Sequence, residues 1–159
     1  LSRVPHNRFA DVDSVLAELL RTDVNALAVM KKTLGTAIGQ PGDGAPQLYQ
    51  AEAWRSTDTL ASLQAGVAGS RALWDGNGFR ALAAGKNPAL VKAIDDVFDS
   101  LQSTLAGMKQ PLPVLLDSDD GKLVLKKLYV QLDSLHLLHE RELAKTLGVQ
   151  LGFNGTDGD

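Results

Sequence analysis

Two histidines and a glutamate near the C-terminal end, His136, His139 and Glu140, have a spacing that permits metal chemistry. Residues three and four apart lie on one face of a helix. Two imidazoles and a carboxylate are ligands that zinc and iron accept. However, His139 continues a seam of leucines, where a histidine is more often a hydrogen-bonded core residue. We therefore treat these three residues as weak metal candidates.

A second polar cluster surrounds Trp54, where Glu52, Arg55 and Ser56 can share one helical face. One interpretation is a ligand-binding groove, in which Arg55 holds an anionic ligand or a carboxylate. Glu52 would then hydrogen-bond and orient a residue that binds a metal. The alternative is an intrahelical Glu–Arg pair on a solvated face, and the residues alone leave both interpretations open.

Ser70 and Arg71 follow about four turns further along the same predicted helix, so they can line the same groove. A structural role for this pair is the competing interpretation. Trp54 and Trp74 also share this helix, where a place in the core or in an interface is favoured over a ligand site.

Other kinds of site find little support. The segment 117–121 and the tail 154–159 are rich in aspartate and glycine, but neither has the ligand positions and following glutamate of an EF-hand. A nucleophilic catalytic triad is not indicated, because the sequence has no Gly-x-Ser-x-Gly motif and no cysteine. The glycines follow no strand, so a phosphate-binding loop is not indicated.

The composition narrows the class of protein. The chain has 159 residues, enough for one domain with a substantial core. With 16 basic and 19 acidic residues the net charge is −3, which gives no electrostatic footprint for nucleic acid. The absence of cysteine excludes disulfides and thiolate metal sites. No apolar run approaches the roughly 18 residues of a membrane span, and no signal peptide is visible. Because the chain starts at Leu1 without a methionine, we interpret it as an excerpt or a cleavage product of a longer protein.

Four long segments have the apolar periodicity of helices. They span about 11–38, 45–74, 88–108 and 119–147. Asn87 with Pro88 behind it, and Ser118 or Asp119, are the expected N-caps of the third and fourth helices. Gly148 is the expected C-terminal stop. No segment alternates like a strand, so the sequence predicts an all-α, up-down-up-down four-helix bundle over residues 1–159.

The chain resembles the C-terminal half of the imelysin-like proteins, also called peptidase M75. Two patches carry the resemblance. One is Ala51-Glu52-Ala53-Trp54-Arg55-Ser56 with Ser70-Arg71-Ala72-Leu73-Trp74. The other is the closing stretch from Leu147-Gly148-Val149 through Gly152-Phe153-Asn154 to Asp157-Gly158-Asp159.

The resemblance implies a protein of two similar bundles that is exported to the bacterial periplasm or outer membrane and associated with iron uptake and its partner proteins. It places the family's Gly-x-His-x-x-Glu signature in an N-terminal bundle, facing a groove between the bundles. That signature is not present here, because Leu137 stands where His139-x-x-Glu142 would need a glycine. Iron or zinc would therefore bind mainly through the N-terminal half. The rival expectations are an M75 metallopeptidase and a purely structural interaction bundle.

Overall fold

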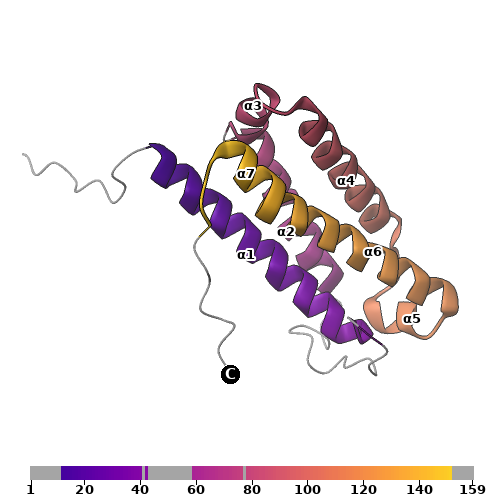
Figure 1. Cartoon of the computed structure of the whole chain (residues 1–159). Coiled ribbons are helices and arrows are strands. Elements are labelled where there is room, and N and C mark those ends of the chain that lie inside the picture. The colour runs from indigo at the N-terminus through magenta and orange to yellow at the C-terminus, as the bar shows by residue number, and fades with distance from the viewer. Residues whose placement is uncertain (1–11, 41, 43–58, 77, 152–159) are drawn as a thin grey trace, which may run out of the picture.

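A computed structural model describes residues 12–40, 42, 59–76 and 78–151 of the chain, and within these ranges the structure is helical with no strand (Figure 1). Four long helices build the fold: α1 (Val12–Ile38), α2 (Thr59–Gly76), α4 (Pro88–Gly107) and α6 (Asp119–Leu137). Two short helices lie between them, α3 (Phe79–Ala84) and α5 (Leu112–Leu116). Helix α6 continues into the π-helical segment η2 (Leu138–Leu143) and the short α7 (Ala144–Leu147).

The four long helices form a closed ring, in which α1 and α4 each pack against both α2 and α6. Contacts between the helices fix their directions. Asp23 of α1 faces His139, while Lys31, further along α1, pairs with Asp133, which lies earlier in the chain than His139. Helices α1 and α6 therefore run antiparallel. The predicted all-α class and four-helix bundle are confirmed.

The core is dominated by aliphatic side chains, with the leucine seam of α6 at its centre. Its members are all fully buried: Leu125, Leu128, Leu132 and Leu135. Each buried leucine contributes roughly 1.5–3 kcal/mol of apolar burial, so this seam is a large part of what holds α6 between α1 and α4. Val12, in the first turn of α1, is 73% exposed, and full burial along this helix begins only at Leu20.

The helix ends follow the chemistry expected from the sequence. The Asn87 side chain accepts a hydrogen bond from the Leu90 backbone N–H at 3.1 Å, with Pro88 in the first turn. The Ser118 hydroxyl accepts one from Gly121 N–H, also at 3.1 Å. Gly148 has φ 72°, a left-handed conformation that ends α7.

Two features differ from the prediction, and part of one predicted helix is not described. In the second predicted helix, residues 45–58 lie outside the described residues, so α2 is described only from Thr59. The short helices α3 and α5 were not predicted, because five or six residues are too few to show a helical period. The π-helical segment η2 interrupts the fourth helix, and a single inserted residue leaves no clear mark on the pattern of apolar side chains.

Glycine allows close approaches between segments inside the bundle. A Cβ on Gly66 would lie 2.3 Å from Met30 Sδ of α1, whereas one on Gly69 would have no atom within 4 Å. Of these two glycines of α2, only Gly66 therefore lies at a close approach between helices. The tightest position is Gly121, where a Cβ would meet the Leu115 carbonyl oxygen at 2.1 Å.

We expect Gly121→Ala to lower the free energy of unfolding by about 1–3 kcal/mol, because the contact is with backbone that cannot rotate away. The matched control, Gly69→Ala, should leave stability unchanged or raise it by up to about 1 kcal/mol, since alanine is the better helix former. Urea denaturation of both variants measures the difference. Equal stabilities would show that α5 moves away from α6 without cost.

Candidate functional site: a buried aspartate–histidine pair

Three polar side chains lie in the apolar core where helices α1, α2 and the segment η2 meet. They are Asp23, Ser70 and His139, with exposed fractions of 5%, 4% and 1%. Buried polar groups lose their hydration, so each needs a partner inside the protein. The arrangement of these three groups is therefore the most unusual polar feature in the described part of the bundle.

The two ring nitrogens of His139 have different surroundings. Nδ1 lies 2.9 Å from the Leu135 carbonyl oxygen. A carbonyl only accepts hydrogen bonds, so Nδ1 carries the proton and donates it. Nε2 then holds a lone pair, and it lies 3.6 Å from Asp23 Oδ2 with no hydrogen-bond partner among the described residues.

Aromatic rings enclose the imidazole on two sides. The ring centroids of Trp74 and His139 are 6.0 Å apart at an interplanar angle of 65°. Those of Phe98 and His139 are 5.9 Å apart at 88°. Both are edge-to-face arrangements, which favour aromatic contact and keep water away from the imidazole.

Burial shifts the two titratable groups in opposite directions. Loss of hydration is the main cause that lowers the pKa of His139 to about 4. The hydrogen bond to the Leu135 carbonyl acts in the opposite direction and raises the pKa. For Asp23, burial raises the pKa to about 6, and the interaction with Ser70 partly opposes the rise. In both cases the uncharged form is favoured, as expected in a site of low polarity.

A second polar layer connects the buried pair to the surface between α2 and α4. The Trp74 indole N–H donates to Asp95 Oδ1 at 2.9 Å, and Arg80 binds both carboxylate oxygens of Asp95, the closest contact at 2.7 Å. Burial acts to raise the pKa of Asp95, but hydrogen bonds from Arg80 and Trp74 outweigh it and the pKa is lowered. Asp95 is therefore a charged anchor for the tryptophan.

Ser70 and Arg71, predicted together, lie in different environments. Ser70 points into the core beside Asp23. Arg71 lies over the Phe98 ring at 5.3 Å, bonds Asp75 at 2.8 Å and Asp99 at 3.2 Å, and also lies 3.7 Å from Asp95. Its charge is already matched by these aspartates, which favours the structural interpretation of Arg71.

The three weak metal candidates also separate. His139 is buried in the core, and His136 is 8% exposed with its pKa lowered by burial and by Lys31. The Glu140 side chain is 42% exposed and lies beside Arg141. Across the described ranges, no group of three or more histidine, cysteine, aspartate or glutamate side chains is arranged to hold a metal ion.

The remaining predicted groove residues, Glu52, Trp54, Arg55 and Ser56, lie outside the described residues, as does the tail 152–159. Asp23 was not singled out from the sequence, although a signal existed. It lies three residues after Leu20 and four before Leu27, on the inward stripe of the first helix. A carboxylate at such a position predicts a buried partner.

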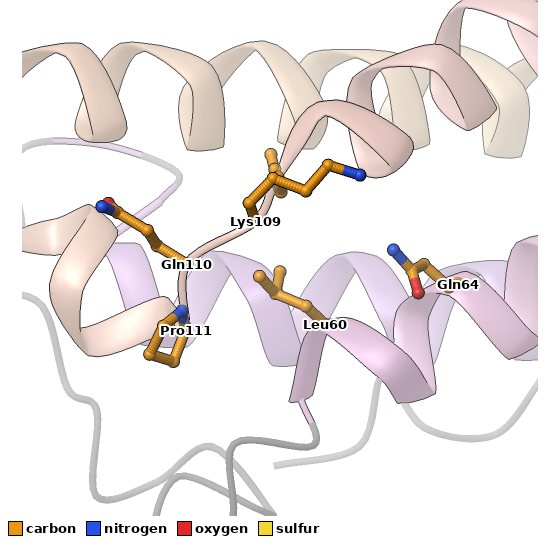
Figure 2. A pocket seen from close by; sticks show the side chains of 6 residues that line it. Leu60, Gln64, Lys109, Gln110 and Pro111 are labelled. Carbon is orange, nitrogen blue, oxygen red and sulfur yellow. The ribbon is translucent and has the colours of Figure 1, made fainter.

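A shallow pocket of about 230 Å³ lies at the far end of α2, away from the buried pair. Figure 2 shows Leu60 and Gln64 of α2 facing the chain segment Lys109, Gln110 and Pro111 that follows α4. Gln64 donates to the Leu105 carbonyl at 3.2 Å. With one lysine and no carboxylate or imidazole in its lining, this pocket has no group for acid–base or metal chemistry.

The described residues form an all-α four-helix bundle. Its buried polar side chains lie in the core and do not line an open cleft. In sequence, the chain matches the family described as Peptidase M75, imelysin, over residues 5–139. This match covers most of the chain, so the protein belongs to the imelysin family. The match includes the patch of residues 51–56 and 70–74, and it ends at His139, before the closing stretch that begins at Leu147. No curated protein matches the chain, and no solved structure does.

We expect Asp95→Ala to destabilise the protein by about 1–3 kcal/mol, because it leaves the Trp74 indole N–H without its acceptor. The neighbouring Asp96→Ala removes only an exposed pair with Lys92 and should change stability by no more than about 0.5 kcal/mol. Chemical denaturation followed by tryptophan fluorescence measures both. Equal effects would mean that water replaces Asp95 without cost.

The pH dependence of stability follows from the two shifted pKa values. Asp23 holds its proton more tightly when folded, so its contribution is complete below its ordinary value of 3.8 and is lost as the pH rises through about 6. His139 favours its neutral form when folded, so its contribution is present above 6.5 and is lost as the pH falls through about 4. In the wild type the two effects largely cancel.

Single variants should separate these effects. Relative to the wild type, we expect His139→Leu to lose about 3 kcal/mol of stability as the pH rises from 4 to 7, and Asp23→Asn to gain a similar amount. Denaturation curves at a series of pH values measure the difference. Parallel pH profiles for all three proteins would contradict the assignment.

Proposed function

We propose that this chain is one bundle of an exported imelysin-type binding protein that serves bacterial iron uptake, in the periplasm or at the outer membrane. The observation that carries the proposal is the family match over residues 5–139. Among the described helices, none has the length and apolarity of a membrane span.

Binding is a better-supported role than peptide hydrolysis. A metallopeptidase needs a metal with an open position, an activated water and a base, all reachable by the substrate. His139 is 1% exposed and enclosed by Trp74 and Phe98, so a peptide has no path to it. Glu140 lies outside the core. We therefore place the metal chemistry, with iron or zinc, mainly on an N-terminal bundle that carries Gly-x-His-x-x-Glu.

In this proposal the chain supplies one wall of a groove between the bundles. Glu52, Trp54, Arg55 and Ser56 supply its polar contacts, with Arg55 as the residue for an anionic group. Ser70 and Arg71 support the wall from behind. This division of roles rests on the partners of Arg71, whose three aspartates leave it little free charge for a ligand.

The test compares the protein containing both bundles with residues 1–159 alone, using Fe²⁺ and Zn²⁺ as probes. The two-bundle protein should bind metal stoichiometrically, and the isolated chain should not. Glu52→Gln or Arg55→Ala should weaken binding by roughly tenfold, the value of one charge-assisted contact. Lys92→Ala, an exposed charge on α4, is the matched control. Calorimetry and metal analysis give the readout.

Three outcomes would contradict the proposal. Stoichiometric metal on the isolated chain would return the metal site to His136, His139 and Glu140. Chelator-sensitive cleavage of peptides by the two-bundle protein would favour the metallopeptidase. Unchanged binding in the Glu52 and Arg55 variants would leave this chain as a structural interaction bundle.

A further inference from the structure

We propose that Asp23 and His139 share a single proton between Oδ2 and Nε2, and that this proton fastens helix α1 to the π-helical segment η2 in mildly acidic solution and is released towards neutral pH. The inference concerns the core of the bundle and is independent of the iron-related function.

The tautomer of His139 is the first support. Its Nδ1–H is committed to the Leu135 carbonyl at 2.9 Å, so Nε2 is the acceptor that faces Asp23. An unprotonated Asp23 is also an acceptor, and two acceptors repel. A proton on Oδ2 converts the same contact into an O–H···N hydrogen bond, after the carboxyl group closes from 3.6 Å to hydrogen-bond distance.

The surroundings favour a neutral pair over an ion pair. Both residues are buried, with exposed fractions of 5% and 1%, and the rings of Trp74 and Phe98 cover the imidazole. Two separated charges here would lose their hydration and would need several further hydrogen bonds to recover it. A neutral acid–imidazole pair needs only the one shared proton.

The charged groups around the pair do not supply a substitute for that proton. From α6, His136 acts on His139 and lowers its pKa further. From α2 come Ser70 and Trp74, which carry no charge, and Arg71, which lies over Phe98 of α4. Asp95 of α4 bonds the Trp74 indole, and Lys31 of α1 pairs with Asp133. Glu140 and Arg141 of η2 itself act on His136.

The pKa values agree with this ordering of protons. The pKa of Asp23 is raised to about 6 and the pKa of His139 is lowered to about 4. In an unfolded chain the histidine has the higher pKa of the two. Between these two values the folded pair holds one proton on the carboxyl side. The unfolded chain holds one on the imidazole, so folding moves the proton from His139 to Asp23.

The π-helix makes the proton structurally important. π-helical turns are rare and have to be held by local contacts. Within η2, His139 reaches back to the Leu135 carbonyl with one ring nitrogen and across to α1 with the other. Losing the proton replaces the second contact with a repulsion, so η2 should open more often.

The experiment follows the wild-type chain by NMR between pH 4.5 and 7.5, so that no variant has to fold. At pH 5, His139 should show a protonated Nδ1 and an unprotonated Nε2, with Asp23 as the acid. As the pH rises to 7.5, Asp23 should ionise, the Nε2 signal should shift with it, and amide protection in residues 138–143 should fall about threefold or more after correction for intrinsic exchange.

Two variants sharpen the result. Asp23→Asn keeps an N–H donor towards Nε2 at every pH, so protection of η2 should no longer fall as the pH rises. Asp99→Asn, an exposed carboxylate, should keep the wild-type step. An imidazolium at pH 5, a fall in η2 protection with rising pH that survives in Asp23→Asn, or Zn²⁺ binding that displaces the proton would each overturn the proposal.

Discussion

The packing of helix α6 between α1 and α4 is the constraint on which the rest of the structure depends. Its leucine seam is fully buried, and the seam continues into His139 one turn after Leu135. A leucine there would only need to be covered. An imidazole has two nitrogens to satisfy, so the core around it needs a carbonyl, a carboxyl group and aromatic walls. The polar centre of the bundle follows from this one residue.

That polar centre extends in layers from the core to the surface. Around His139 lie uncharged or nearly uncharged contacts, because charges are expensive where water is absent. One step outward, Trp74 bonds Asp95, which is partly exposed and can remain ionised beside Arg80. Arg71 then covers Phe98 and meets the outer aspartates. The sequence of layers explains why Ser70 and Arg71, adjacent in the chain, have different roles.

Membership of the imelysin family gives this architecture a biological setting without assigning chemistry to the core. The buried pair is closed to a substrate, and the described surface pocket lacks groups for catalysis. A rigid bundle with a packed interior is suited to forming one side of a groove against a second bundle. The proposed groove is consistent with that role, because its polar residues precede the well-packed part of α2.

The sequence by itself determined the helical class, the four long segments, the cap at Asn87 and the family, because periodicity and capping are local and the patches that carry the resemblance can be read from the sequence. For the fourth helix it left Ser118 or Asp119 as the cap, and the structure shows that Ser118 has this role. It also indicated that His139 belongs to the leucine seam. Only the tertiary structure decided that Asp23, some hundred residues earlier, faces His139, and that a π-helical turn presents the imidazole. Such pairings depend on how antiparallel helices align, and no local pattern in either helix encodes that alignment.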